Sequence, residues 1–154
     1  YQQTKNYNAE KILRTKIEEK CIFFEDLLNA LPVLISYVDQ QKRYQFNNSC
    51  YEKWFGFKKE NLKNKFIFDV VGQEAYSVIG PFVDKALNGE TIHTERYIFY
   101  NNRDSVLFTR FSYIPHFNLN KEVLGFFVLV HDITDHRKIE EELKTLKNEA
   151  ELNL

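Results

Sequence analysis

The sequence predicts an α+β domain with a five-stranded antiparallel sheet, short helices on one face, and a coiled-coil helix at each end. Three observations support this prediction. The apolar pattern reads, in order, helix, two strands, several short helices, three strands and helix. The last three strands are joined by connections of four residues each, 101–104 and 118–121, which require antiparallel pairing. Both ends of the chain carry heptad patterns.

Length and composition suit one domain with appendages. The chain has 154 residues, and its hydrophobic fraction of 44% is enough to build a core. A formal net charge of -1 gives no general attraction to nucleic acid or anionic lipid. The longest apolar run, Phe126–Val130, is far shorter than the roughly 20 residues of a membrane-spanning helix. We therefore expect protein or small-molecule partners, no nucleic acid and no membrane insertion of this segment.

The N-terminal part is predicted to form a long helix followed by two strands. From Glu10 to Leu31 the apolar residues follow a heptad seam. Pro32 ends this helix because the residue before a proline is pushed out of the α region. Strands are expected at 33–38 and 43–47, separated by a polar turn. The chain has no methionine, so we expect it to be a segment of a longer protein.

The middle of the chain is predicted to be helical and the last third to be strands. Asn48 or Ser49 caps a short helix that Gly56 terminates, and a second short helix lies within 58–65. A longer helix spans 73–88, where Pro81 is expected to kink or restart it. Strands follow at 91–100, 105–117 and 122–133, and the asparagines between them tolerate left-handed turn conformations.

The most specific pattern in the chain lies where the last strand meets the last helix. The strand closes with Asp132-Ile133-Thr134, and a charged heptad helix follows without a break. This join resembles a PAS domain, whose last strand commonly closes with Asp-Ile-Thr before an output helix of the form Arg-Lys-x-x-Glu-x-x-Leu. The helix here reads Arg137, Lys138, Glu141 and Lys144, with Leu143 one place before the usual leucine position. Further matches are Asn48, Tyr51, Glu52 and Gly56, and Tyr113-x-Pro115 with Gly125-Phe126-Phe127-Val128.

The resemblance implies an organisation and a role. Residues 1–31 would be an N-terminal amphipathic helix, 32–134 the PAS domain and 135–154 a C-terminal signalling helix. A PAS domain implies a cytoplasmic sensory or regulatory module of a multidomain bacterial signal-transduction protein. The tail 141–151 is similar to the lead-in of a histidine kinase dimerisation helix, so a sensor histidine kinase is the expected parent. A diguanylate cyclase or phosphodiesterase is the alternative.

The residues argue against the cofactors that some PAS domains carry. Relatives that bind haem place a histidine on the long helix, and 73–88 contains none. Flavin photoreceptors carry a cysteine within Asn-Cys-Arg-Phe-Leu, whereas Cys50 precedes Tyr51-Glu52-Lys53. No histidine pair has the helical spacing of a zinc site, and Cys21 and Cys50 form no Cys-x-x-Cys motif. We expect no haem, no flavin, no metal and no other cofactor.

A small ligand could still occupy the cleft between the sheet and the helices that a PAS domain has. The cleft candidates, chosen by their alternation, are Trp54, Tyr76, Phe82, Thr94, Arg96, Phe108, Arg110 and Phe127. If Arg96 or Arg110 points into the cleft, its guanidinium would favour a carboxylate ligand. The alternative places both on the solvent face, paired with Glu95 or Asp104, and a register shift of one residue separates the two. The aromatic residues can equally fill a core.

The C-terminal helix is predicted to pair and to transmit a signal. Ile139, Leu143, Leu146 and Ala150 follow a coiled-coil seam, so we expect a homodimer through the flanking helices. Thr134 is expected to cap this helix with its hydroxyl, and Asp132 to accept hydrogen bonds that fix its exit angle. These two residues would couple the sheet to an output domain in the same parent chain.

Two other functions compete with signal relay. One is a ligand-free module that only dimerises, which a cleft filled by aromatic residues would favour. The other is an enzyme or carrier with a small-molecule site on a related α+β fold. No catalytic serine lies in a Gly-x-Ser-x-Gly turn, and none of the five glycines are paired in a phosphate loop. We therefore expect no catalytic residues in this segment, and the heptads favour the first two functions over the third.

Overall fold

The computed structural model describes residues 1–154, which divide into two compact units, Tyr1–Pro32 and Val33–Leu154. The first unit is a single helix, α1 (Gln2–Ala30), with no buried residues. It begins eight residues earlier than the heptad pattern predicted, because 2–9 contain neither proline nor glycine to stop it. Leu31 takes an extended conformation before Pro32, as expected from the proline. The heptad-seam residues Leu13 and Ile17 of α1 are more than half exposed.

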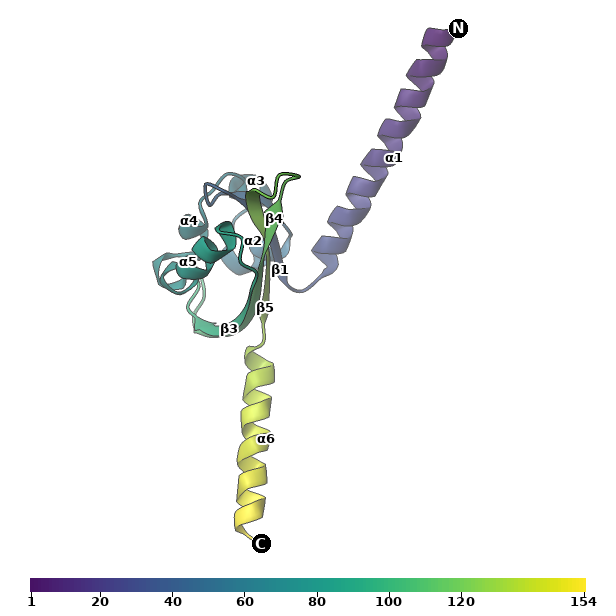
Figure 1. The fold of residues 1–154 in the computed structure, drawn as a ribbon. Coiled ribbons are helices and arrows are strands. Elements are labelled where there is room, and N and C mark those ends of the chain that lie inside the picture. Colours follow the sequence, from purple (N-terminus) through teal and green to yellow (C-terminus); the bar gives the residue numbers. More distant parts are fainter. The chain divides into compact units, whose positions relative to one another are not determined.

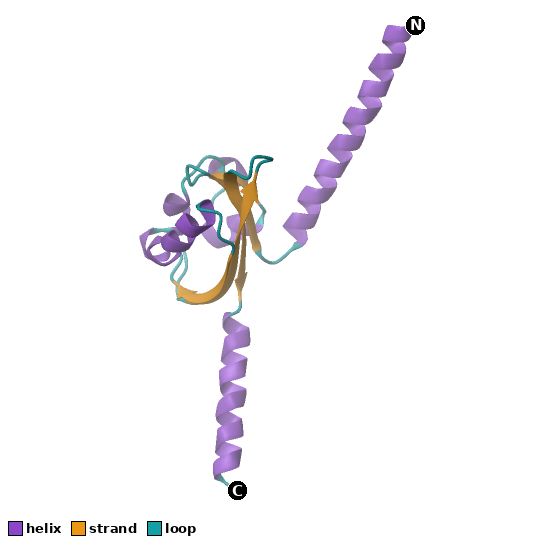
Figure 2. Ribbon diagram, in the orientation of Figure 1, coloured by secondary structure: helices purple, strands orange, loops and turns teal.

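The second unit contains a five-stranded sheet with helices on one face (Figures 1 and 2). The strands are β1 (Leu34–Asp39), β2 (Tyr44–Asn47), β3 (Ile92–Ile98), β4 (Leu107–Phe117) and β5 (Val123–Asp132). Their order in the sheet is β2-β1-β5-β4-β3, and every neighbouring pair is antiparallel. The predicted α+β class and five-stranded antiparallel sheet are therefore confirmed.

The first and last strands are neighbours at the centre of the sheet. Leu34, the first residue of β1, pairs with Val130 near the end of β5. The chain therefore enters and leaves the sheet at the same end. From β5 the chain passes directly into α6 (Thr134–Leu152), which has no buried residues.

Four helices connect β2 to β3 and cover the inner face of the sheet. They are α2 (Cys50–Phe55), α3 (Lys59–Leu62), α4 (Ile67–Val71) and α5 (Gln73–Leu87). Gly56 ends α2 in the left-handed conformation, as predicted. The α5 helix runs through Pro81 as one element, so the predicted restart does not occur. Pro81 and Ser77 are exposed, so water can satisfy the Ser77 carbonyl that loses its amide partner.

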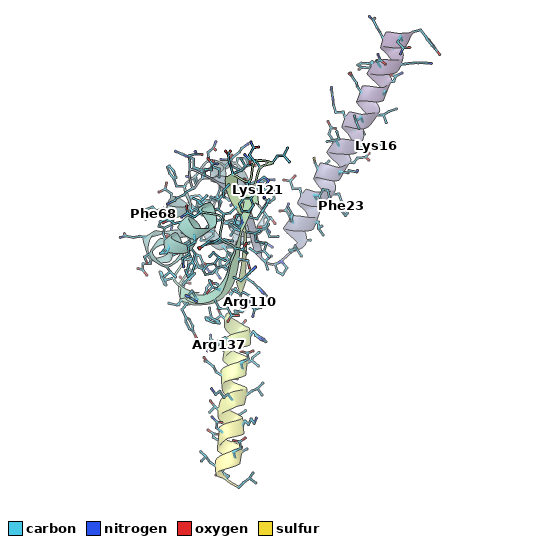
Figure 3. All side chains as sticks on the ribbon, in the orientation of Figure 1. Lys16, Phe23, Phe68, Arg110, Lys121 and Arg137 are labelled. Atoms are coloured by element: carbon cyan, nitrogen blue, oxygen red, sulfur yellow. The ribbon has the colours of Figure 1, made fainter.

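The strands have one buried face and one partly exposed face. In β5, Phe126 and Val128 are buried, whereas Phe127 and Leu129 remain 44% and 45% exposed. The helices thus cover only one side of the apolar run 126–130. Figure 3 shows side chains filling the space between the sheet and its helices, whereas those of α6 project into solvent.

The connections between the last strands partly follow the sequence prediction. Asn102 adopts a positive φ between β3 and β4, as expected for asparagine. Between β4 and β5 the positive φ falls on Lys121 instead. Asn118 has another role there, because its Oδ1 accepts hydrogen bonds from the amides of Asn120 and Glu122, each 2.9 Å long. None of the helices is both long and apolar enough to cross a lipid bilayer.

Candidate functional site

A cluster of tyrosines occupies the space between the sheet and the helices. Tyr44, Tyr51, Tyr100 and Tyr113 are each at most 3% exposed. The Tyr51 hydroxyl donates to Ser36 Oγ at 2.8 Å. The rings of Tyr44 and Tyr51 pack edge to face, with centroids 5.4 Å apart. The cleft predicted from the resemblance is therefore filled by the protein's own aromatic rings.

Burial controls the protonation of these tyrosines. It raises the pKa of Tyr100 to about 12, although a hydrogen bond with Thr109 acts in the opposite direction. Burial also raises the pKa of Tyr44 and Tyr113 well above the ordinary value, and nearby tyrosines add to the effect. Because desolvation disfavours the phenolate, all three stay neutral near physiological pH.

Little space remains inside the cluster. The residual cavity is about 20 Å³, enough for roughly one water molecule. Its walls come from the inner face of the sheet and from the helices: Leu34, Val38, Tyr44, Tyr51, Phe55, Ile67, Val71, Ile79, Tyr100, Tyr113, Phe126, Val128 and Val130. None of the eight residues proposed from the sequence lines this cavity.

Three of the eight proposed residues lie on the other face of the sheet, where the cleft prediction was wrong. Phe127 packs against Tyr37 on that face, with ring centroids 5.1 Å apart. Phe108 and Arg110 also point there, because β3 pairs Arg96 with Thr109 and Glu95 with Arg110. Paired residues share a face, so the sequence had combined one face of β3 with the opposite face of β4.

The other five lie on the helix side but around the rim of the core. Phe82 packs edge-on against Phe111, with centroids 5.5 Å apart, and Trp54 against Tyr100 at the same separation. Tyr76 contacts the ring of Phe68. Two neighbours on β3 complete the set. They are Thr94, which is half-buried, and Arg96, which is exposed.

Both arginines have partners within the protein. Arg110 donates through Nε and Nη2 to Glu95 Oε1, at 2.9 and 2.8 Å. This is the solvent-face pairing that the sequence offered as the alternative. Arg96 donates to Thr94 Oγ1 at 2.6 Å, and its guanidinium lies 5.3 Å from the Phe82 ring. Neither guanidinium therefore lies buried and unpaired in the cleft.

The join between β5 and α6 is held by a compact set of hydrogen bonds. Thr134 Oγ1 accepts from the amide of Phe108 on β4 at 3.0 Å and donates to Asp132 Oδ1. Asp132 Oδ1 also accepts from the Thr134 amide at 3.0 Å, and the Ile133 amide donates to the Phe108 carbonyl at 2.9 Å. Thr134 is the first residue of α6, so its hydroxyl bonds the sheet instead of capping the helix as predicted.

Arg137 adds a contact that the sequence did not reveal. Its guanidinium lies 5.3 Å from the centroid of the Phe108 ring. The ring of Tyr97 packs against the same Phe108 ring, with the two centroids 4.6 Å apart. A hydrogen bond with Tyr97 and the nearby Glu141 carboxylate raise the pKa of Arg137. Figure 3 marks Arg137 in the first turn of α6. The first turn of α6 is thus attached to β3 and β4 as well as to β5.

The seam residues of α6 beyond this first turn are open to solvent. Ile139 is 55% exposed, and Leu143 and Leu146 are each 61% exposed. They form an apolar stripe along a helix that is otherwise polar. No three histidine, cysteine, aspartate or glutamate side chains come together as a set that could hold a metal ion. Cys21 is exposed and Cys50 buried, and burial raises the pKa of the Cys50 thiol.

Comparison with known proteins assigns the chain to a family. The family model described as the PAS fold matches residues 28–138. The PAS domain of Bordetella pertussis BvgS is 23% identical, with a TM-score of 0.60, over 85% of this chain and 98% of that one. A PAS domain from Colwellia psychrerythraea is 17% identical, with a TM-score of 0.59, over 80% and 98% respectively.

The PAS domain of histidine kinase ThkA is 20% identical, with a TM-score of 0.51, over 65% of this chain and 98% of that one. At these identities the solved structures support the fold alone. No curated protein matches the sequence. The family match covers more than two thirds of the residues, and the sheet order and the covering helices agree with it. The chain belongs to the PAS fold family.

Proposed function

We propose that this chain is a sensory or regulatory module, itself non-catalytic, of a multidomain bacterial signal-transduction protein that works in the cytoplasm. It would relay its state to an output domain through a dimeric coiled coil. A sensor histidine kinase is the parent we favour, and a diguanylate cyclase or phosphodiesterase is the alternative. The boundaries we propose are 1–31, 32–134 and 135–154.

The observation that carries the proposal is the attachment of α6 to three strands at once. Covalent continuity links the helix to β5, the Thr134 hydroxyl links it to β4, and Arg137 links it to Tyr97 on β3. A change in the sheet would therefore alter the position of the first helical turn. Because interfaces of this kind switch between discrete arrangements, a small shift at the join can become a change of coil packing.

The exposed stripe on α6 supports dimerisation. Two heptads are marginal as an isolated helix, and burial of Leu143 and Leu146 against a second copy would stabilise them. PAS domains commonly dimerise, which agrees with this role. The seam on α1, with Leu13 and Ile17 exposed, would contribute in the same way.

Analytical ultracentrifugation tests this proposal. Leu143→Glu combined with Leu146→Glu should convert a dimer into a monomer. The matched control is Asn148→Glu, which adds a negative charge on the opposite side of the same helix and should leave the dimer intact. A wild-type chain that remains monomeric at high concentration, or a double variant that sediments as a dimer, would contradict the proposal.

The filled cleft favours a second candidate, a module that dimerises without a ligand in its core. A residual volume of about 20 Å³ is far below the roughly 300 Å³ of a small-molecule pocket. Native mass spectrometry separates the two candidates. A non-covalent adduct retained by the purified protein would support ligand sensing, and the mass of the polypeptide alone would support the dimerisation module.

A further inference from the structure

The heptad pattern of α6 extends back beyond its apolar residues to the join with the sheet. Ile139 and Leu146 are at d positions and Leu143 is at an a position, so the preceding a position is His136. The His136 side chain is 66% exposed, and its Nε2 lies 3.0 Å from Glu140 Oε1, one turn further along the helix. A histidine therefore occupies a seam position that is usually apolar.

The seam side of this first heptad, 135–141, is open to a second helix. Arg137, which contacts Phe108 and Tyr97 on the sheet, is at a b position, away from the seam. The attachment of α6 to the sheet therefore leaves the a and d positions uncovered, and Ile139 is more than half exposed.

The charges beside the second heptad, 142–148, favour a second copy of this chain in parallel orientation. In a parallel two-stranded coil, each g residue faces the e residue of the next heptad in the partner. That pairing puts Glu142 opposite Lys147 of the second copy, and the symmetry of a dimer repeats the pair. The second heptad is thus complementary in charge to its own copy.

The first heptad is different, because its e and g residues are both acidic. The same pairing puts Asp135 opposite Glu140 of the second copy, so a dimer gathers four carboxylates around its two His136 side chains. This group carries four negative charges when both imidazoles are neutral and two when both are protonated. Repulsion between the carboxylates therefore opposes closure of the first heptad, and protonation of His136 reduces that repulsion.

The other charged groups near the join leave this balance unchanged. Arg137 pairs with Glu141 at 3.2 Å, and Lys138 is at a c position, away from the seam. Asp132, at the end of β5, accepts its hydrogen bonds from Thr134. The charge at the start of the seam is thus set by Asp135, His136 and Glu140 of the two copies.

We propose that 135–141 is a proton-sensitive part of the dimer seam, in which protonation of His136 closes the two helices up to the join with the sheet. Histidine is the side chain that changes charge between about pH 5 and pH 8. Each imidazolium pairs with Glu140 of its own helix and Asp135 of the second copy, which outweighs the repulsion between the two imidazoliums. At higher pH the second heptad alone holds the helices together. This inference rests on the coiled-coil dimer proposed above and adds the proton as its regulator.

Sedimentation equilibrium of the full chain at about pH 8 and about pH 6, at one ionic strength, tests the inference. The Kd for dimerisation should be about threefold to tenfold lower at the lower pH, as expected when two exposed ion pairs form. His136→Gln should abolish this difference. Glu140→Lys should lower the Kd at the higher pH, because it turns the repulsion from Asp135 into attraction.

Each variant has a matched control. His131→Gln removes another exposed histidine, on β5, and should keep the pH response, whereas Glu151→Lys makes the same charge change at a b position and should leave the Kd unchanged. The inference is overturned, with the dimer intact, if the wild-type Kd is the same at both pH values or rises at the lower one. It is also overturned if His136→Gln keeps the pH response, or if Glu140→Lys dimerises no more tightly than Glu151→Lys. A wild-type chain that is monomeric at both pH values overturns the proposed dimer as well.

Discussion

Thr134→Val is the sharpest test of how the sheet is coupled to α6. Valine keeps the branched shape of threonine but removes the hydroxyl. The Phe108 amide would lose its acceptor at 3.0 Å, and Asp132 would lose one of its two donors. The β4 strand would then be attached to the helix only through the bond from the Ile133 amide and the contact with Arg137.

The expected cost follows from the positions of these bonds. The bond to Phe108 is partly buried, and the bond to Asp132 is exposed. Losing the first and weakening the second should lower the free energy of unfolding by about 1–2 kcal/mol. For a domain of about 100 to 150 residues, this lowers the melting temperature by roughly 3–10 °C. The domain should still fold, since small domains have about 5–15 kcal/mol of stability.

The effect on output should be larger than the effect on folding. A change of 1–2 kcal/mol in the equilibrium between two helix arrangements alters their ratio by about 5–30-fold. We therefore expect Thr134→Val, and likewise Asp132→Ala, to change the kinase or cyclase activity of the full-length parent. Calorimetry of this chain and an activity assay of the parent measure the two effects separately.

Thr145→Val is the matched control for this experiment. The Thr145 hydroxyl donates to the Glu141 carbonyl within α6, at an exposed position. The same chemical change there should alter stability by less than about 0.5 kcal/mol and leave output unchanged. If Thr134→Val unfolds the chain, or if it lowers the melting temperature but leaves output as it is in Thr145→Val, then the join has only a structural role. If the two variants have the same melting temperature and output, the Thr134 hydroxyl has neither role.

Three further predictions concern the core. Burial raises the pKa of Tyr100 to about 12 whereas an unfolded tyrosine titrates near 10, so the folded state retains its proton over a range in which the unfolded state loses it. The contribution of such a tyrosine to the free energy of unfolding should thus be constant below about pH 10. Above that pH the free energy of unfolding should fall by about 1.4 kcal/mol per pH unit for each such tyrosine. Denaturant titrations should show a shallower fall for Tyr100→Phe. Gly125→Ala should destabilise the fold by about 1–3 kcal/mol, because an added Cβ would overlap the Val38 carbonyl oxygen. Unchanged denaturant unfolding would refute this. Purified protein should show neither haem nor flavin absorption, and visible colour would contradict that expectation.

The sequence predicted the elements of the fold well because strong local signals mark them. Apolar alternation identified the strands, Gly56 ended α2, and the short connections dictated antiparallel pairing. Of the kink or restart predicted at Pro81, the restart does not occur, since a proline on an exposed helix face leaves its unpaired carbonyl to water. Which face of a helix is exposed to solvent depends on the packing of the whole domain, and the local sequence does not show it.

The cleft residues were harder to predict, because they depend on register. The sequence of β3 has polar residues on both faces, so it does not reveal that Arg96 lies opposite Thr109 instead of Arg110. With the correct register, the alternation in β4 would have identified Tyr113 as a core residue. The contact of Arg137 with Tyr97 joins residues far apart in sequence, and no periodicity predicts it.

The adjacency of β1 and β5 has a consequence for how such a chain can be assembled into longer proteins. Because Leu34 and Val130 are paired neighbours, the polypeptide returns almost to the point where it entered. A unit of this kind can be inserted between two helical segments, duplicated in tandem, or excised, without opening a large gap in the main chain. The same pairing determines how the sheet would respond to force. A pull applied at Leu34 and Val130 would break the β1–β5 pairs one after another, beginning with the pair at that end.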